Sequence, residues 1–526
     1  MRNIVVLILS VAIGLSLQAQ DPNAPMNWHL KDAQTNNLQG TSTEKAYKEL
    51  LQNGNQKEIV VAILDSGVDI YHEDLQGKIW VNEDEIPANG IDDDKNGYID
   101  DVNGWSFIGG EGGDVNYDNL EFTRIYKKLK AKYEGKSADN ISKSDKKDYA
   151  KYLRFEEQYK KRMEDAEAEY NEFMQIYMAY QQAKALMQEK TRKEDPTLEE
   201  LAKVKTENEM EEAFKAFVME IKSAGAESQL EEGKEHYESA IKYMYNLDFD
   251  SRGIVGDNYE DVTEKYYGNN NVKGPDSRHG THVAGIVAAV RNNKLGAQGI
   301  AHNVKIMSVR VVPNGDERDK DVANSIRYAV DNGAHIINMS FGKSYSPNKG
   351  VVDEAARYAA SKGVLLVHAA GNSSKNIDQK NNFPNDTPRE GGKQISSWIE
   401  VGSSSWMEEP MSVSSFSNYG KKSIDIFSPG SDIYSTTPEN NYERLSGTSM
   451  AAPVVAGVAA LVWSNNPELS AVELKEILID SAVNKKKIKV DLPGESTDLV
   501  KFKKLGKNGG IVNTYNALKL ASEKAK

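Results

Sequence analysis

The stretch "IVVAILDSG", residues 59–67, indicates the class of fold. Its first six residues are apolar and mostly β-branched, which is typical of a strand buried on both faces of a parallel sheet. The aspartate, serine and glycine that follow indicate the turn at which this strand ends. Similar runs occur at residues 305–312, 334–339 and 364–369, so we expect further strands of the same kind.

Helical stretches lie between these runs, at residues 321–332 and 353–362. Strands that alternate with helices predict an α/β fold with a doubly wound parallel sheet flanked by helices. Such sheets bind ligands at the carboxyl ends of their strands. We therefore expect polar residues that directly follow a predicted strand, such as Asp65 and Asn372, to lie near a functional site.

Residues 117–250 interrupt this pattern with a segment that is rich in Lys, Glu, Tyr, Met and Gln and poor in Pro and Gly. Apolar and aromatic residues recur there every three or four positions, close to a heptad pattern. The first part of this stripe consists of Tyr149, Tyr152, Phe155, Tyr159, Met163, Ala166, Tyr170, Phe173, Tyr177 and Tyr180.

The stripe is interrupted at Asp195 and Pro196, after which Thr197 and Glu200 predict a capping box at the start of another helix. The stripe then continues through Leu198, Leu201, Met210, Phe214, Phe217 and Ile221. We therefore predict a long inserted α-helical hairpin, coiled-coil-like, over residues 117–250. Its stripe could bind a protein partner, but packing within the hairpin is the favoured interpretation.

Composition narrows the classes of partner. The formal net charge of -14 and the pI of about 5.3 argue against nucleic acids and anionic membranes as main partners. With 39% hydrophobic residues, the 526-residue chain can bury a sizeable core. It contains no cysteine, which excludes disulfides and thiol catalysis.

Residues 1–19 have the pattern of a secretory signal peptide. One arginine precedes an apolar run at residues 4–17, and Leu17-Gln-Ala19 is a plausible cleavage site. The run is shorter than the roughly twenty residues that span a bilayer, and we expect no later stretch to span one. We predict export to the periplasm or the cell exterior, with a short N-terminal segment over residues 20–50.

A second stretch, "LSGTSMAAPVV" at residues 445–455, surrounds Ser449 with small side chains. A serine hydroxyl is a poor nucleophile unless a base takes its proton and fixed donors receive the negative charge. Asp65, His279 in "RHGTHVAGIVAAV" and Asn372 in "VHAAGNSS" could supply these groups. Pro453 is expected in the first turn of the following helix, where no amide donor is needed.

Together these stretches resemble the subtilisin family of serine endopeptidases, in which the aspartate, the histidine and the serine follow one another in this order. The matching stretches are "AILDSGVDIYHEDL", "HGTHVAGIVAAV", "INMSFG", "AAGN" and "SGTSMAAPVVAGVAALV". The resemblance implies a catalytic domain over residues 51–116 and 251–526, and polypeptide substrates.

The resemblance also implies a role for each matching residue. Ser449 would attack the scissile carbonyl, His279 would act as general base and then general acid, and Asp65 would orient the His279 ring. Asn372 and the Ser449 backbone N–H would form the oxyanion hole, and His282 would be structural. The substrate-binding walls would be formed by Ser340, Phe341, Gly342, Ala370 and Gly371.

The loop "NGIDDDKNGYIDDVNGW", residues 89–105, has the spacing of a calcium-binding loop. Its candidate ligands are Asp92, Asp94, Asn96, the Tyr98 carbonyl, Asp100 and Asp101. Asn103 stands where such loops usually carry a bidentate glutamate, so an Asn/Asp-rich surface turn is the alternative. By resemblance to subtilisins, Asp74 and Asn293 are expected at a second structural calcium site.

Two other functions stay open at this point. One is a catalytically idle scaffold that captures peptides in its cleft and a partner on its hairpin. The other is the related acid peptidase group, in which glutamate replaces the histidine and aspartate the asparagine. The intact Asp65, His279, Asn372 and Ser449 argue against both. The short N-terminal segment and the stretch "VVPNGDERDKD" depart from the family pattern.

Overall fold

The computed structural model describes residues 24–51, 56–389, 392–494 and 498–524. The predicted signal peptide lies outside the described residues. The chain divides into two compact units. The helical unit comprises Phe122–Phe249, and the sheet unit comprises the described residues of Gln20–Glu121 and Asp250–Lys526.

The sheet unit is built on nine strands in the order β12-β15-β9-β8-β7-β6-β1-β5-β2. Every neighbouring pair is parallel except β12 with β15. The strands are β1 (Ile59–Asp65), β2 (Gly104–Ser106), β5 (Val304–Arg310), β6 (Ile336–Met339), β7 (Leu365–Ala369), β8 (Trp398–Ser404), β9 (Ile426–Pro429), β12 (Val483–Asn484) and β15 (Gly510–Ile511). The predicted α/β sheet is therefore confirmed, with β1 between β5 and β6.

Alternate side chains of β1 enter two different apolar layers. Val61 and Ile63 belong to one layer, whereas Ala62 and Leu64 belong to the other. Because both faces are covered, the strand is apolar at nearly every position. The first layer contains α10 (Arg278–Ala288), α13 (Thr448–Asn465), α14 (Ala471–Asp480) and α15 (Thr514–Lys524). The second contains α11 (Asp319–Asp331) and α12 (Lys349–Ser361).

Shorter elements complete the sheet unit. They are η1 (Trp28–Leu30), α2 (Ala33–Asn36), α3 (Thr43–Glu49), η2 (Glu73–Leu75), β3 (Gly109–Gly110), β4 (Gly113–Asp114), α9 (Arg252–Val255), β10 (Ile433–Thr437), β11 (Asn441–Leu445), β13 (Lys489–Asp491), β14 (Leu499–Lys501) and η5 (Phe502–Lys504). β10 and β11 form a hairpin. Its first strand holds the N-terminal half of α10 through Thr436, whose hydroxyl donates to the Thr281 carbonyl.

α13 is apolar around its whole circumference because it lies inside the sheet unit. By length and composition alone, this helix of 18 residues could cross a membrane, whereas no such stretch was expected from the sequence. However, 89% of its residues are buried inside the protein. A helix that is apolar on all sides is also what the centre of a large domain requires.

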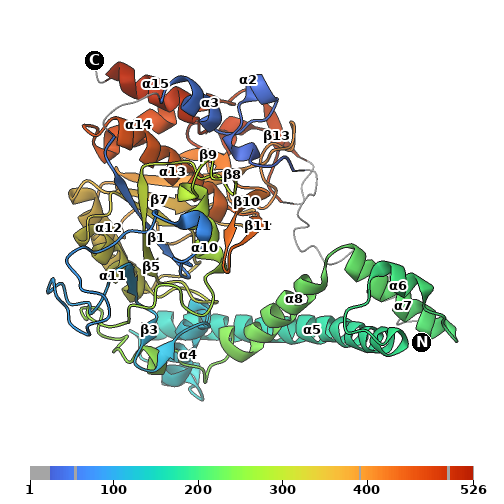
Figure 1. The fold of residues 1–526 in the computed structure, drawn as a ribbon. Helices are drawn as coiled ribbons and strands as arrows, with labels where there is room; N and C mark the ends of the chain where they lie inside the picture. Colours follow the sequence, from blue (N-terminus) through green and yellow to red (C-terminus); the bar gives the residue numbers. More distant parts are fainter. Residues whose placement is uncertain (1–23, 52–55, 390–391, 495–497, 525–526) are drawn as a thin grey trace. The chain divides into compact units, whose positions relative to one another are not determined.

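The helical unit centres on α5 (Lys146–Thr191), a helix of 46 residues. The chain returns along α5 in several pieces rather than as a single helix (Figure 1). The other helices are α4 (Glu121–Tyr133), η3 (Ala138–Asn140), α6 (Leu198–Lys203), α7 (Glu209–Ser223), α8 (Glu227–Ser239) and η4 (Ala240–Met244). The long inserted helical hairpin is thus confirmed, and so is the capping box of Thr197 with Glu200.

The aromatic stripe packs largely within the helical unit. Phe155 stacks on Phe122 of α4 with ring centroids 4.9 Å apart, and Tyr180 meets Phe217 of α7 edge-on at 5.7 Å. Leu198 and Met210 depart from the pattern because their side chains are exposed. The coiled-coil character of the stripe stays a prediction.

The N-terminal segment is an integral part of the sheet unit. Trp28 is fully buried, and its indole N–H donates to the Ser431 carbonyl at 3.0 Å. Thr43 and Thr514 of α15 share a hydrogen bond between their hydroxyls at 2.7 Å. The Tyr47 hydroxyl donates to the Ile300 carbonyl at 2.9 Å.

One buried guanidinium holds the two chain segments that flank the helical unit. Arg318 donates to both carboxylate oxygens of Asp118, at 2.7 and 3.0 Å. It also donates to the Ser251 hydroxyl at 3.3 Å. The chain therefore leaves and re-enters the sheet unit at neighbouring points.

Candidate active site

The predicted site residues lie at the carboxyl ends of neighbouring strands. Asp65 is the last residue of β1, the segment 340–342 directly follows β6, and the segment 370–372 directly follows β7. β6 pairs with both β1 and β7, so these segments meet at one edge of the sheet. This is the position at which parallel α/β sheets bind ligands.

Asp65 and His279 form a close pair. His279 Nδ1 lies 2.6 Å from Asp65 Oδ1, and the Asp65 side chain is almost fully buried. α10 can approach β1 this closely because residue 280 is glycine. A Cβ atom there would lie 2.1 Å from the Gly67 carbonyl oxygen.

Two effects of the environment of His279 act on its pKa in opposite directions. Burial lowers the pKa of this imidazole, but the charge of Asp65 and the hydrogen bond to it outweigh burial and raise the pKa above its usual value. The side chain is 39% exposed, so solvent screens part of this interaction. The nearby His282 behaves in the opposite way, because burial lowers its pKa to about 3 and keeps the ring neutral.

Ser449 is the second residue of α13. Its hydroxyl donates to the Ser340 carbonyl at 3.0 Å, and the Ser340 hydroxyl donates back to the Ser449 carbonyl at 2.8 Å. In this structure the hydroxyl proton of Ser449 therefore points to Ser340 rather than to His279. Hydrogen bonds of a catalytic site are often looser before substrate binds than in the reacting complex.

Pro453 explains why the Ser449 carbonyl is available to Ser340. The prediction that Pro453 lies in the first turn was wrong, because the helix begins at Thr448 and Pro453 is inside it. A proline has no N–H to donate to the carbonyl four residues earlier, which is that of Ser449. The Ser340 hydroxyl satisfies this carbonyl instead.

Asn372 faces the start of the same helix. Its Oδ1 accepts hydrogen bonds from the Thr448 backbone N–H and the Thr448 hydroxyl, both at 2.8 Å. Because these donors fix which end of the amide is oxygen, Nδ2 points the other way. A Cβ atom on Gly447 would lie 3.2 Å from Asn372 Nδ2 and 3.5 Å from Ser449 N. Two donors thus border one small space, which stays open because residue 447 is glycine.

Comparison with models of protein families matches residues 56–509 to the subtilase family. The chain belongs to the subtilase family. The prediction of a subtilisin-like serine endopeptidase is thereby confirmed.

Individual relatives agree. The chain is 40% identical to thermitase of Thermoactinomyces vulgaris over 223 residues. This aligned region covers 41% of this chain and 74% of thermitase. It is 38% identical over 208 residues to alkaline elastase YaB of a Bacillus species, which covers 39% of this chain and only 50% of that protein. The solved structure of sphericase is 29% identical, covering 48% of this chain and 81% of sphericase, with a TM-score of 0.39.

The predicted substrate-binding segments of this subtilase are linked by a residue that the sequence did not single out. Asn382 Nδ2 donates to the Ala370 carbonyl at 3.0 Å. Its Oδ1 is 2.9 Å from where a Cβ atom on Gly342 would stand. Asn382 therefore lies between the segment 340–342 and the segment 370–371. Its position in the polar stretch "KNNFPN" gave no pattern by which to recognise it.

The acidic loop gathers carboxylates, including one that the sequence pattern missed. Glu85, Asp92 and Asp94 each place one carboxylate oxygen within 4.8 Å of the others. Glu85 Oε2 is buried and has no hydrogen-bond partner among the described residues. Burial raises the pKa of Glu85 and that of Asp101, as expected for carboxylates gathered without a counter-charge. The donor set therefore fits a hard cation such as calcium.

The other predicted ligands have protein partners. Asp100 accepts the Asn89 and Gly90 backbone N–H groups with its two oxygens, at 3.0 and 2.9 Å, and so holds the loop together. Asp101 accepts the Tyr328 hydroxyl at 2.6 Å. Asn96 donates from Nδ2 to Asp94 and Asp101, and the Tyr98 ring is buried. At the second predicted site, Asn293 Nδ2 donates to Asp74 Oδ1 at 2.6 Å.

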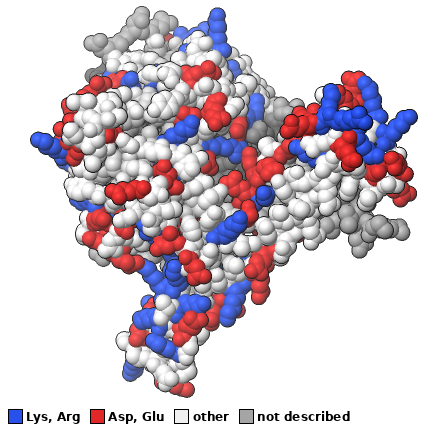
Figure 2. Space-filling model, turned by 60° about the horizontal axis from the view of Figure 1, so that its bottom comes forward, with Lys and Arg blue, Asp and Glu red and all other residues white. Residues whose placement is uncertain are grey.

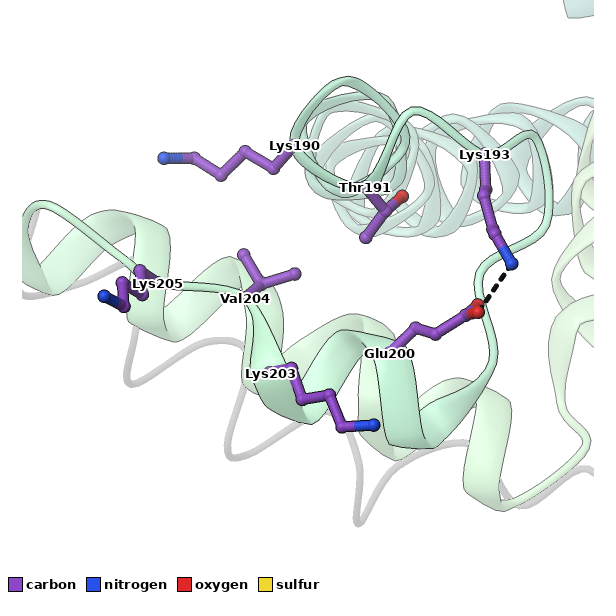
Figure 3. A pocket seen from close by; sticks show the side chains of 7 residues that line it. All are labelled: Lys190, Thr191, Lys193, Glu200, Lys203, Val204 and Lys205. Carbon is purple, nitrogen blue, oxygen red and sulfur yellow. Dashed lines mark hydrogen bonds and ion pairs between the residues drawn. The ribbon is translucent and has the colours of Figure 1, made fainter.

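The helical unit has a surface hollow of about 420 Å³ with a different chemistry (Figure 3). Four lysines line it, and Lys193 pairs there with Glu200 at 2.6 Å. No predicted site residue lines this hollow. Over the face that Figure 2 shows, acidic and basic side chains are interspersed.

Proposed function

We propose that this subtilase hydrolyses peptide bonds through an acyl-enzyme, with Asp65, His279 and Ser449 as its triad. The observation that carries the proposal is the 2.6 Å contact of His279 with Asp65 at the sheet edge that Ser449 reaches through Ser340. Because Nδ1–H is donated to the carboxylate, Nε2 carries the lone pair of the neutral imidazole. It can therefore accept the Ser449 proton.

The first step begins with a rotation of the Ser449 hydroxyl. It leaves the Ser340 carbonyl, turns to His279 and attacks the substrate carbonyl as its proton passes to Nε2. The imidazolium, stabilised by Asp65, then protonates the leaving amine. Water repeats the sequence on the acyl-enzyme, so His279 acts once as base and once as acid in each half-reaction.

The negative charge of the tetrahedral intermediate goes to the space beside Gly447. Asn372 Nδ2 and the Ser449 N–H are its proposed donors, since both border that space. Loss of one such donor typically slows turnover by about 100- to 1000-fold. We assign Ser340, Phe341, Gly342, Ala370 and Gly371 to the walls that hold the substrate chain.

We further propose calcium as a structural ion of the acidic loop, held by Glu85, Asp92 and Asp94 with Asn96, the Tyr98 carbonyl, Asp100 or Asp101 completing the shell. The ion would supply only the charge that this carboxylate cluster lacks. Asp74 and Asn293 are proposed for a second calcium site.

We extend the proposal to the organisation of the chain. Residues 1–19 direct export to the periplasm or the cell exterior, residues 51–116 and 251–526 form the catalytic domain, and residues 117–250 form an inserted arm that can engage a protein partner.

A fluorophosphonate probe tests the proposed nucleophile. With calcium present, the wild-type protein should be labelled at Ser449 and the Ser449→Ala variant should not. Equal labelling of both proteins, or of neither, would refute the assignment. Absence of labelling in a folded wild-type protein would favour the peptide-binding scaffold instead.

A further inference from the structure

A buried histidine and a buried glutamate interrupt two strands that are otherwise lined by apolar and small residues. His368 in β7 and Glu400 in β8 are directly opposite each other in the parallel register. His368 is fully buried, and Glu400 is 5% exposed. Trp398, two residues before Glu400, lies on the same face of the sheet because strand side chains alternate.

Hydrogen bonds use every polar atom of this pair. His368 Nδ1 lies 3.0 and 2.9 Å from the two Glu400 oxygens. The Trp398 indole N–H donates to Glu400 Oε2 at 2.9 Å. On the other side of the imidazole, Nε2 lies 2.8 Å from the Phe341 carbonyl oxygen. A carbonyl can only accept, so Nε2 carries a proton. Nδ1 faces the carboxylate on the opposite side of the ring.

Stability alone does not account for such a pair. Replacing a buried ion pair by apolar residues of similar volume is often neutral or stabilising, because the desolvation of both groups is removed with them. The strands around it show that apolar residues fit this layer well. The feature that distinguishes the pair is the group it contacts, which is the backbone of the segment 340–342.

That segment is held from both sides through alternate carbonyls. The Ser340 carbonyl accepts the hydroxyl of Ser449, and the next carbonyl, of Phe341, points the opposite way and accepts from His368. In an extended segment, successive carbonyls face opposite sides. Fixing the Phe341 carbonyl toward His368 therefore places the backbone polar groups of Ser340 and Gly342 on the side of Ser449.

We propose that His368, oriented by Glu400 and Trp398, is a positioning residue for substrate binding, which sets the backbone direction of the segment 340–342. This inference rests on the function proposed above, since it assigns that segment to substrate pairing. It predicts an effect on extended peptides that pair with the segment, and little effect on small reagents that need only the nucleophile and its base.

The pair is itself anchored to the neighbouring strand. The Glu400 backbone N–H donates to Asp425 Oδ2 at 2.9 Å. Asp425 in turn pairs with Lys507 at 2.9 Å and with Lys475 at 3.5 Å. The backbone position of Glu400 is thus fixed by groups outside the segment 340–342, as a positioning device requires.

The test compares three variants. His368→Met combined with Glu400→Met removes both polar side chains together and keeps the volume close to that of the wild type. Glu400→Gln keeps an acceptor for Trp398 and an N–H that can donate to Nδ1, so His368 Nε2–H can still hold the Phe341 carbonyl. His29→Met is the matched control, because His29 is equally buried but lies in the N-terminal segment.

Each variant is assayed with a chromogenic peptide that has four residues before the cut, and with a small fluorophosphonate. The double variant should raise KM for the peptide by about tenfold, the scale of one lost hydrogen bond, with kcat and the labelling rate within about twofold of wild type. Glu400→Gln should retain most of the wild-type kcat/KM, and His29→Met should match the wild type.

Three outcomes would overturn the inference: an unchanged KM in the double variant, an equal loss of peptide cleavage and labelling, or a loss in Glu400→Gln as large as in the double variant. If the double variant does not fold, Glu400→Leu with the same readouts decides, since it leaves His368 without its orienting partner. Failure of the wild-type protein to react with the fluorophosphonate would instead refute the proposed function.

Discussion

Gly447→Ala should abolish most peptidase activity while leaving the fold nearly intact. The new methyl would lie 3.2 Å from Asn372 Nδ2 and 3.5 Å from Ser449 N, in the space assigned to the oxyanion. An oxyanion must come within about 2.7–3.1 Å of its donors, so the methyl and the oxyanion cannot both fit. Because both donors are obstructed, we expect kcat to fall by at least about 100- to 1000-fold.

The effect on stability should be small. The φ of residue 447 is 166°, extended backbone that alanine adopts without strain. Exchange of glycine for alanine at a helix N-cap costs about 0.5–1 kcal/mol. The neighbours that a methyl would meet include the flexible Met450 side chain at 3.7 Å.

The assay is a double-mutant cycle with Asn372→Ala, measured as kcat/KM on a peptide amide and as melting temperature. If the methyl already denies the oxyanion access to Asn372, the double variant should be little slower than Gly447→Ala alone. Full activity in Gly447→Ala would refute the placement of the oxyanion site. So would strictly additive losses, because they would mean that the two residues act in separate places.

Three further predictions concern the base, the acidic loop and the N-terminal segment. Asp65 raises the pKa of His279 above 6.5, and the base must be neutral, so kcat/KM should fall as the pH drops through a value above 6.5. Asp65→Asn should move this acid limb of the pH profile to lower pH. An unmoved acid limb would contradict the pairing of Asp65 with His279. Calcium should raise the melting temperature of the wild type and of the exposed-site control Asp84→Asn, but raise that of Glu85→Gln less; an equal rise in all three would reject Glu85 as a ligand. Trp28→Ala should lower the free energy of unfolding in urea by about 3–5 kcal/mol, as for other large buried aromatics, and a loss below about 1 kcal/mol would show that the segment is not integral.

The sequence predicted those parts of the molecule whose signals are local. The run at residues 59–64 specified a strand buried on both faces, and Thr197 with Glu200 specified a helix start, since each pattern reports its own few residues. The triad positions came from a resemblance, and the structure brings Asp65 and His279 into contact. Family membership was likewise recognisable from short motifs.

The remaining features depend on partners that are distant in the chain. Glu85 precedes the spacing pattern of the acidic loop, so only the folded loop brings it to Asp92. The pairing of His368 with Glu400 requires the register of β7 against β8, which a single sequence does not reveal. Pro453 was misplaced by reading proline as a first-turn residue, whereas a side chain from Ser340 compensates for the missing amide inside the helix.

The hydrogen bonds of Arg318 to Asp118 and Ser251 have a consequence for the insertion of the helical unit. The 128 residues of the helical unit roughly double the chain separation between β1 and β5. Loop-closure entropy rises only with the logarithm of length, so this doubling adds about 0.6 kcal/mol to assembling the sheet. Arg318 holds together the two points at which the inserted segment leaves and re-enters the sheet unit. Inserted segments of quite different length can therefore replace one another at this position, in evolution or by grafting, without changes to the rest of the sheet unit.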